Sequence, residues 1–491
     1  MEARPWLLVV AISLSACATP TPQKQIVDDA AAALGGRDRI LAVKTLVVEG
    51  DGRNGNLGQD MTPEATAQGF TVSGYKRTVD VAAGRARVEQ TRTPDFLYFQ
   101  GQAPQKQVFG VDGDVAYNVA AAGNAIRGSN AVAKDRRTEI YHHPLTALRA
   151  ALDSASTVTN PRTEGNHTFV EVATANGAAF TLVVDSATKL PARVVSKTDN
   201  ANLGDVAIET SFTDYQDVSG LKLPARLTTK IDGYTNADLH LTKQTVDGDA
   251  GDLAAPAAVV SAPPIAGPAP PKVTAEEVAK GVWWLTGQSH HSVLVEFGDH
   301  LTLIEVPLNE ARSLAVIAKA RELVPGKPLT QVVNTHAHFD HSSGIRAAVA
   351  EDLTVITHKG NAQYYRAAVE RPHTIAPDAL AKNPKPLKIE TVDEEMTLQD
   401  TTRTVNLYHI AGNPHADTLL MAYFPKERIL VEADAFSPAG PAAPAAAAGE
   451  PYAPNLLDNV RKRGLKVDRI VPIHGAIAPF SSLVKTGTAA P

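Results

Sequence analysis

The spacing of hydrophobic residues changes twice along this chain of 491 residues. Between residues 24 and 43, apolar side chains recur every three or four positions, which predicts helical structure. From residue 46 to 246 they alternate with polar ones in short runs separated by Gly, Asp, Asn and Pro, which predicts strands joined by turns. Beyond residue 273, strand-like and helix-like runs follow one another, which is typical of a layered α/β domain.

The alternating region predicts a mainly antiparallel β domain with one further helix over residues 144–153. Strands are expected at 46–52, 86–91, 96–101, 106–119, 168–173, 180–185, 191–198, 207–217, 224–234 and 237–246. A series of antiparallel strands fronted by a helix predicts an open, curved sheet or half-barrel.

Residues 253–272 are rich in Pro and Ala and have no periodicity, so we expect a semi-rigid linker there. This places a β-rich N-terminal domain at 24–250 and an α/β domain at 273–485. In the second domain, strands are expected at 281–287, 292–298, 301–306, 330–335, 353–358, 404–410, 417–425, 428–433 and 468–473. Helices are expected at 309–324, 343–351 and 455–464.

The first residues of the chain have the pattern of a targeting segment. An apolar run at residues 6–14 has the length of a signal-peptide core and is too short to span a bilayer. The following Leu14-Ser15-Ala16-Cys17 resembles the lipobox of bacterial lipoproteins. The resemblance implies a signal peptide at 1–17, a lipidated Cys17 and a protein anchored in the cell envelope facing the periplasm. Ala18 after the cysteine favours the outer membrane over the inner one, and the alternative is an ordinary cleavage site that contains Cys.

Composition narrows the functional classes. A hydrophobic fraction of 44% is typical of a folded protein and excludes a disordered one. The net charge is −6, with 47 basic and 53 acidic residues, so the chain has no basic footprint for nucleic acid. Cys17 is the single cysteine, which excludes an intramolecular disulfide and a thiolate zinc site. Any metal ion must therefore be held by nitrogen and oxygen atoms.

A dense group of metal-binding residue types lies between a predicted strand and a predicted helix. Its members are His336, His338, Asp340 and His341. Such strand-to-loop junctions are where α/β sheets place their ligands. Neutral imidazole and carboxylate groups supply the lone pairs that a metal site needs. The segment therefore predicts a metal centre.

The segment Thr335–His341 resembles the His-x-His-x-Asp-His signature of metallo-β-lactamase-fold hydrolases, and the resemblance extends over residues 280–475. The later motif positions of that family are filled, in order, by His415, Asp434 and His474. The resemblance implies an αβ/βα sandwich that holds two divalent metal ions. It assigns the first ion to His336, His338 and His415. It assigns the second to Asp340, His341 and His474, with Asp434 bridging the two.

Two phrases in the β-rich region, at residues 183–195 and 212–229, resemble the strand–turn–strand units of periplasmic lipoprotein-carrier-like domains. The resemblance implies a curved sheet that wraps a helix and can shelter an apolar ligand. The alternative is that any meander of strands with Leu-Pro turns has this appearance.

Two divalent ions about 3.5–4 Å apart lower the pKa of a shared water toward neutrality and polarise a carbonyl oxygen. The sequence therefore predicts a hydrolase that uses a metal-bound hydroxide on a small ester, lactone, thioester or lactam. Asp340 is the predicted catalytic residue, since it can both bind an ion and orient the nucleophile. Zinc suits this set of ligands best, and iron or manganese also accept it.

Three other functions stay open. The first is a β-lactamase specifically, and the second is a one-iron oxygenase of the same fold, which needs only one complete ion site. The third is a non-enzymatic periplasmic binding lipoprotein. Among the weaker candidates, His290 and His291 contact substrate or belong to a plain turn, and Tyr364 and Tyr365 are candidates to line the cleft. The Pro- and Ala-rich segment 437–454 is either a lid or an unstructured insertion.

Overall fold

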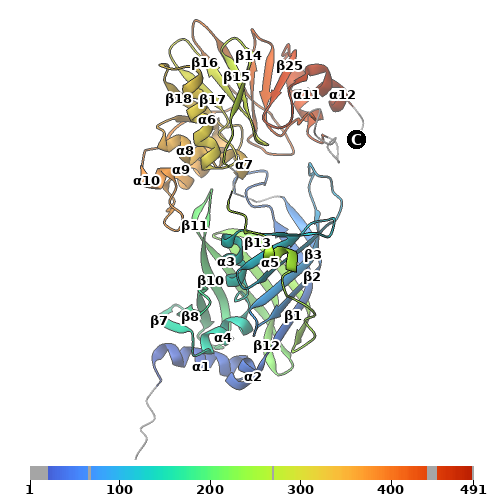
Figure 1. The fold of residues 1–491 in the computed structure, drawn as a ribbon, viewed down its shortest axis with the longest axis vertical. Coiled ribbons are helices and arrows are strands. Elements are labelled where there is room, and N and C mark those ends of the chain that lie inside the picture. The colour runs from blue at the N-terminus through green and yellow to red at the C-terminus, as the bar shows by residue number, and fades with distance from the viewer. Residues whose placement is uncertain (1–19, 65–67, 268–269, 440–449, 489–491) are drawn as a thin grey trace, which may run out of the picture.

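The computed structural model describes residues 20–64, 68–267, 270–439 and 450–488, which form two domains stacked end to end (Figure 1). The expected signal peptide with Cys17 lies outside the described residues, as does part of the segment 437–454. Among the described residues, every helix is too short or too polar to cross a lipid bilayer.

The N-terminal domain is a 13-stranded antiparallel sheet with helices, in the order β6-β5-β4-β3-β2-β1-β13-β12-β11-β10-β9-β8-β7. The first strand therefore pairs with the last in the middle of the sheet, with Leu46 opposite Val246. Its helices are α1 (Pro22–Leu34), α2 (Arg37–Ala42), α3 (Asn130–Glu139) and α4 (Pro144–Leu152). Its strands are β1 (Thr45–Gly55), β2 (Gly69–Asp80), β3 (Arg85–Pro94), β4 (Gln105–Asp112), β5 (Val115–Val119), β6 (Ala125–Arg127), β7 (Thr157–Glu164), β8 (His167–Ala173), β9 (Ala179–Asp185), β10 (Pro191–Asn200), β11 (Gly204–Val218), β12 (Leu221–Ile231) and β13 (Tyr234–Val246).

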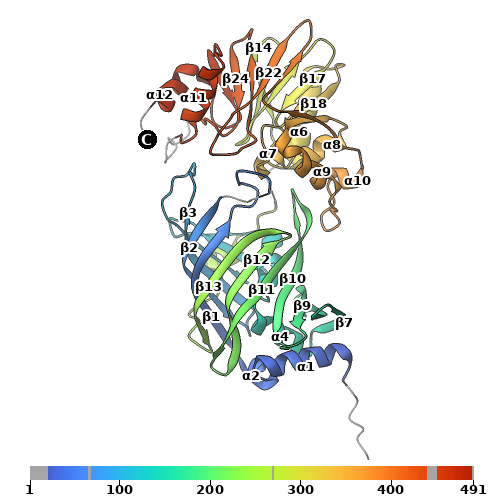
Figure 2. The same cartoon turned by 180° about the vertical axis from the view of Figure 1, so that it is seen from behind.

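The sheet curves around α4, and α1 lies across its lower end, as Figure 2 shows from behind. Helix α1 buries Val27 and Leu34 on its inner face, and α4 buries Leu145 and Leu148. Each such side chain contributes about 1.5–3 kcal/mol when it is fully buried. The sheet also encloses a cavity of about 250 Å³ that both apolar and polar side chains line. The curved sheet around a helix was predicted, and shelter of an apolar ligand stays a prediction.

Two strand predictions in this domain were wrong. Residues 96–101 form a loop between β3 and β4, where Phe96, Tyr98 and Phe99 pack ring against ring at centroid distances of 5.3 and 4.7 Å. The aromatic run has the composition of a buried strand, but its rings pack against one another within the loop. Residues 106–119 form the hairpin β4–β5 rather than one strand, because Gly113 adopts a φ of 54° that permits a tight turn.

The C-terminal domain is a sandwich of two sheets between two helical layers. Strands β14–β20 form a seven-stranded sheet and β21–β26 a six-stranded one. The strands are β14 (Thr274–Ala279), β15 (Val282–Thr286), β16 (Ser292–Glu296), β17 (Leu301–Ile304), β18 (Leu329–Val333), β19 (Thr354–His358), β20 (Lys388–Val392), β21 (Glu395–Gln399), β22 (Thr404–His409), β23 (Leu420–Phe424), β24 (Ile429–Glu432), β25 (Arg469–Pro472) and β26 (Ala478–Pro479). The helices are α6 (Glu310–Leu323), α7 (Phe339–Ser342), α8 (Ile345–Ala350), α9 (Ala362–Glu370), α10 (Ala379–Lys382), α11 (Ala453–Lys462) and α12 (Phe480–Gly487), with a short 3₁₀ turn η1 (Lys359–Asn361).

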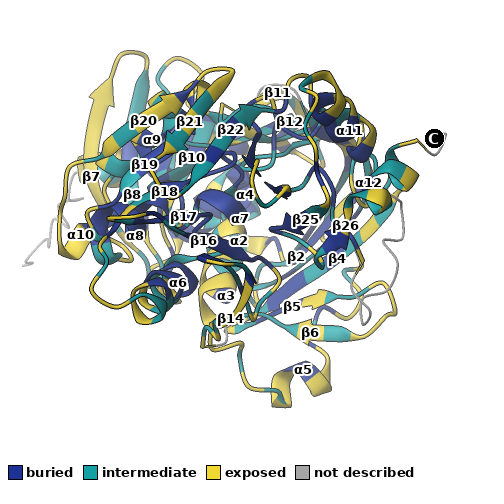
Figure 3. Cartoon of the chain, turned by 90° about the horizontal axis from the view of Figure 1, so that it is seen from above, coloured by how far each residue is buried: buried dark blue, intermediate teal, exposed yellow. Residues whose placement is uncertain are grey.

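One apolar core lies between the two sheets of this sandwich, and two others lie under the outer helices. Strand β17 is buried along its whole length, whereas β7 at the rim of the other domain is mostly exposed (Figure 3). Runs that are apolar at every position form strands covered on both faces. The predicted αβ/βα sandwich is therefore confirmed.

The proposed linker contains a short helix, α5 (Ala257–Ser261), which packs Val259 against Tyr117 of the N-terminal sheet. The two domains also touch directly. The turn after β10 meets the segment after α9, where the Asp205 amide donates to the Pro372 carbonyl at 2.8 Å. The loop between β1 and β2 also contacts the C-terminal domain, where Phe339 N donates to Gly58 O at 2.8 Å.

Candidate metal centre

The His-rich segment leaves the buried strand β18, which lies between the parallel strands β17 and β19. Its first residues are fixed by hydrogen bonds. Asn334 N donates to Ile356 O at 2.8 Å, and Thr335 N donates to the Glu305 carboxylate at 2.6 Å. His338 is the N-cap residue of helix α7, so Asp340 and His341 lie in the first turn of that helix.

The remaining candidate ligands follow other strands at the same edge of the sandwich. His415 lies between β22 and β23, Asp434 follows β24, and His474 follows β25. Asp434 adopts a φ of 58°, a left-handed conformation in which Asp is enriched among non-glycine residues. Residues far apart in the sequence thus meet because the ends of their strands lie at one edge.

The structure brings the seven predicted ligands together in two groups. The first group consists of His336, His338, His415 and Asp434, whose ligand atoms lie within 4.8 Å of one another. His415 Nε2 lies 2.9 Å and His336 Nε2 3.3 Å from Asp434 Oδ2. Among the described residues, His336 Nε2 and His338 Nδ1 are buried without a hydrogen-bond partner.

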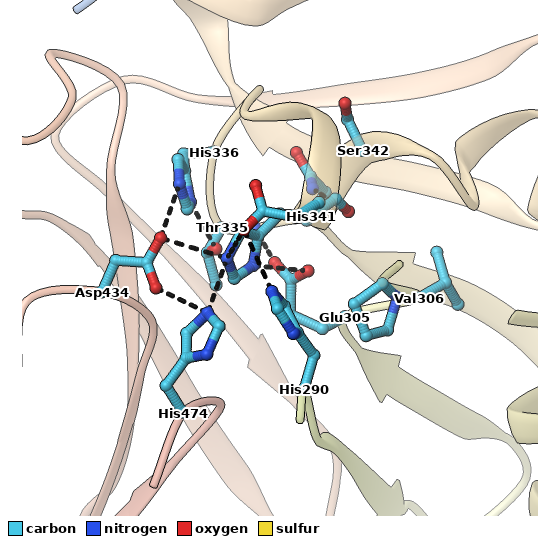
Figure 4. A network of polar contacts seen from close by, with 12 residues as sticks. His290, Glu305, Val306, Thr335, His336, His341, Ser342, Asp434 and His474 are labelled. Atoms are coloured by element: carbon cyan, nitrogen blue, oxygen red, sulfur yellow. Dashed lines mark hydrogen bonds and ion pairs between the residues drawn. The ribbon is translucent and has the colours of Figure 1, made fainter. Parts of the chain in front are cut away.

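The second group consists of His290, Asp340, His341 and His474, again within 4.8 Å of one another. His474 Nε2 lies 2.7 Å from Asp434 Oδ1, while Asp434 Oδ2 faces the first group (Figure 4). Asp434 therefore contacts both groups, because Oδ2 also lies 3.1 Å from His341 Nε2 of the second group. This position is the one expected of a bridging carboxylate.

These contacts fit divalent cations better than hydrogen bonds. His341 Nε2 and His474 Nε2 face each other at 3.0 Å, and His341, His336 and His415 all approach Asp434 Oδ2. A ring nitrogen carries at most one hydrogen, so His341 Nε2 cannot donate to both His474 Nε2 and Asp434 Oδ2. Nitrogen and carboxylate donors converging on two points match the ligand chemistry of zinc and related ions. The ligand roles of the seven residues remain predictions.

Burial and neighbouring charges set the protonation of the site. Burial, reinforced by nearby His341, lowers the pKa of His336 to about 4, so its ring is neutral at neutral pH. Burial raises the pKa of Asp434, but His474 and the other histidines outweigh it and hold that pKa well below its usual range. Burial lowers the pKa of His341, yet Asp434, Asp340 and Glu305 raise it well above its ordinary value. Asp434, Asp340 and Glu305 thus favour a positive charge at the position of His341.

Two residues of the site were not expected from the sequence as ligands or supports. His290 was considered only as a substrate contact or a turn residue, yet its Nε2 lies 3.0 Å from Asp340 Oδ2. Glu305 is fully buried at the end of β17, with one oxygen 3.3 Å from His341 Nδ1 and the other accepting from Thr335 N. A carboxylate behind a ligating histidine fixes its ring orientation. In the sequence, the feature that could have indicated Glu305 is a single charged residue directly after an apolar strand.

The other weak candidates lie outside the two groups. His291 Nε2 donates to Gly475 O at 3.0 Å and packs on Trp284, so this residue supports the loop. Tyr365 is buried and donates to Asn334 Oδ1 at 2.5 Å, which braces the His-rich segment rather than lining a cleft. In the described part of segment 437–454, Tyr452 packs 4.9 Å from the ring of His415.

A layered α/β domain with two His/Asp groups at one sheet edge defines a candidate metalloprotein. Residues 285–474 match the family model of the metallo-beta-lactamase superfamily. No curated protein matches the chain.

Solved structures similar to this chain include three metallo-beta-lactamases, each 18% identical and each matching 44% of this chain. One is from Pontibacter korlensis, covered over 98% of its length with a TM-score of 0.35. FIM-1 from Pseudomonas aeruginosa, in its mono-zinc form, is covered over 93% with a TM-score of 0.33. The protein from Hirschia baltica is covered over 96% with a TM-score of 0.33.

Proposed function

We propose that the C-terminal domain is a hydrolase that uses two divalent metal ions, zinc best of all, to cleave a small ester, lactone, thioester or lactam. The observation that supports this proposal is the pair of four-residue groups: Asp434 belongs to the first and also contacts His474 of the second. A one-iron oxygenase needs only one complete group, so the presence of the second favours hydrolysis.

The chemistry supplied by a bound pair of divalent ions is Lewis-acid activation of water and of the substrate's carbonyl oxygen. His336, His338 and His415 would hold one ion, and Asp340, His341 and His474 the other, with Asp434 shared and His290 as an additional donor. All of these residues lie at the ends of strands or in short turns held by hydrogen bonds. The protein therefore needs little rearrangement to bind the ions.

Asp340 is the residue that we assign to orienting the nucleophile. Burial works to raise its pKa, but the charge of His341 and the hydrogen bond from His290 lower that pKa below the ordinary carboxyl range. The group is therefore a carboxylate at neutral pH. Its Oδ2 faces the second group, so it can accept a hydrogen bond from a water molecule that attacks the substrate.

Elemental analysis of protein expressed with zinc tests the proposal, and we expect about two equivalents of metal. A panel of lactones, thioesters, β-lactams and phosphodiesters then identifies the substrate class. His338→Ala is expected to abolish hydrolysis of the best substrate. His300→Ala is the matched control, because His300 stacks on Phe297 in the same domain, outside both groups. Absence of bound metal, or full activity in His338→Ala, would contradict the proposal.

A further inference from the structure

The loop between β1 and β2, residues 56–68 of the N-terminal domain, lies directly against the candidate metal centre. Its described part makes four hydrogen bonds to the C-terminal domain within four consecutive residues. Phe339 N donates to Gly58 O at 2.8 Å, Gln59 Nε2 to Asp340 Oδ1 at 2.6 Å, His338 Nε2 to Asp60 O at 2.8 Å, and Asp417 N to Met61 O at 2.9 Å. Two of these partners, His338 and Asp340, are candidate ligands, one in each group.

Residues 58–61 of the β1–β2 loop are held in a defined shape by contacts within the described part of the loop. The carboxylate of Asp60, which is only 3% exposed, accepts from Met61 N at 2.7 Å and from Gln68 N at 3.0 Å. Gln59 N donates to Asn56 O at 2.9 Å. The carbonyl of Asp60 and the amide of Gln59 therefore point at their partners from a fixed backbone.

The contact at His338 determines which ring nitrogen carries the proton. A carbonyl oxygen only accepts, so the hydrogen bond to Asp60 O requires the proton on Nε2. Nδ1 is then left with a free lone pair, and this is the buried nitrogen that faces the first group without a hydrogen-bond partner among the described residues. Ligating histidines are commonly oriented in this way by an acceptor on their second nitrogen.

The contact at Asp340 restrains the other group. Gln59 holds Oδ1 from the N-terminal domain, while His290 contacts Oδ2 from the loop between β15 and β16. With one oxygen occupied by a neutral amide, the carboxylate cannot rotate freely, and Oδ2 stays turned toward His341 and His474.

We propose that the N-terminal domain is a working part of the metal centre, acting through the β1–β2 loop. The Asp60 carbonyl positions His338 for the first ion, and Gln59 positions Asp340 for the second. This inference rests on the proposed function. Gln59 and Asp60 are positioning residues rather than ligands, and substitutions of such residues typically weaken metal binding 10–100-fold.

Gly58 provides a way to displace the loop without touching a candidate ligand. A Cβ atom at Gly58 would lie 2.4 Å from the ring of Phe339, and its φ is 78°. Gly58→Ala therefore pushes the loop off the C-terminal domain. Gly74→Ala is the matched control, because Gly74 also has a positive φ, 59°, but no atom within 4 Å of its Cβ position. The control carries the same backbone strain without the collision.

The experiment measures Co²⁺ binding to the full-length protein by chelator competition and by its visible absorption spectrum. We expect Gly58→Ala to weaken binding at least about 10-fold and to change the ligand-field bands. Gln59→Met, which keeps the size of the side chain and removes its donor, is expected to weaken binding of the second ion. Gly74→Ala and Asp205→Ala are expected to bind as the wild type does, since Asp205 contacts Thr374, which is not a candidate ligand.

The two proposals fail in different ways. Wild-type protein that binds no Co²⁺ would overturn both the metal centre and the role of the loop. Wild-type protein that binds two ions, together with Gly58→Ala and Gln59→Met variants of equal affinity and spectrum, would overturn only the role of the loop. Equal losses in Asp205→Ala would also overturn it, because they would show that domain contact in general, and not the loop, supports the site.

Discussion

The N-terminal and C-terminal domains both bury histidines, but they satisfy them differently. In the N-terminal domain, His142 contacts the Thr210 hydroxyl at 2.8 Å and the Ser196 hydroxyl at 2.9 Å, so both ring nitrogens have partners. In the C-terminal domain, His336 and His338 each leave one buried nitrogen without a hydrogen bond among the described residues. His336 Nε2 lies 3.3 Å from Asp434 Oδ2, and both histidines belong to the group whose ligand atoms lie within 4.8 Å of one another.

Burial alone does not separate the two kinds of histidine. It lowers the pKa of His142 to about 3 and is the main reason why that of His336 falls to about 4. Both rings are therefore neutral at neutral pH. What distinguishes the candidate metal centre is a set of nitrogen lone pairs without partners that converge with carboxylates. His291, His373 and His409 also have a buried nitrogen without a hydrogen-bond partner among the described residues, so convergence with carboxylates, and not an unsatisfied nitrogen alone, distinguishes the site.

Removal of the metal ions is expected to cause the largest difference in stability between the two domains. An ion at about 1,000 times its dissociation constant stabilises the domain that binds it by about 4 kcal/mol. Dipicolinic acid is therefore expected to abolish hydrolysis and lower the unfolding temperature that Trp283 and Trp284 report, since both lie on β15. Hydrogen exchange in α4 of the N-terminal domain is expected to stay the same. Equal destabilisation of both domains would contradict the comparison.

Asp434→Asn should have the next largest effect. Asn tolerates the positive φ at this position and keeps the shape of the side chain, but it removes the charge that both groups share. We expect metal content to fall below two equivalents and kcat/KM to drop more than about 100-fold, because residues that only support ligands already account for 10–100-fold. Unchanged metal content in purified Asp434→Asn would contradict the bridging role.

His142 predicts how the stability of the N-terminal domain depends on pH. Its folded-state pKa of about 3 lies below the unfolded value of about 6.5, so protons bind the unfolded chain more tightly. The stability that depends on a neutral His142 is fully present above pH 6.5 and is lost as the pH falls toward 3. The loss in the free energy of unfolding reaches about 2 kcal/mol at pH 5. Urea unfolding of His142→Gln at several pH values should show a shallower dependence. His240→Gln, an exposed position on β13, is the control and should keep the wild-type slope.

Ser196→Ala should have the smallest effect and sharpens the comparison. It leaves one buried nitrogen of His142 without a partner, at a cost of about 1 kcal/mol in the free energy of unfolding. We expect no change in metal content or activity, which the same preparation can test by elemental analysis. A metal ion gained or lost in this variant would show that the two histidine environments are coupled.

The sequence predicted those parts of the molecule that depend on local pattern. The layered α/β domain and the antiparallel N-terminal sheet follow from periodicity, whereas the αβ/βα sandwich was implied by the family resemblance. The segment from His336 to His341 has four candidate ligands within six consecutive residues. His415 and His474 could be placed only through the order of motifs in the family. The strand predicted at 96–101 was wrong because aromatic rings that pack on one another have the same spacing as a buried strand.

Contacts between distant segments could not be predicted. His290 joins the second group because its loop pairs with the turn that carries His474, and no spacing rule links these two positions. Gln59 meets Asp340 only because two domains dock, and a glutamine in a polar loop has no distinguishing pattern. Glu305 became recognisable once β17 was seen to end beside the His-rich segment.

The pairing of β1 with β13 has a consequence for how the protein is assembled. Strand β1 is made first, yet its neighbour β13 closes the domain, so the centre of the sheet forms only after the whole domain has been synthesised. All other neighbouring strands of this sheet are consecutive in the chain, so this one distant pairing, which needs the longest loop to close, is expected to form last. Since the loop that follows β1 contacts His338 and Asp340, their surroundings are complete only after that strand is seated. Completion of the candidate metal centre in the C-terminal domain therefore depends on prior folding of the N-terminal domain.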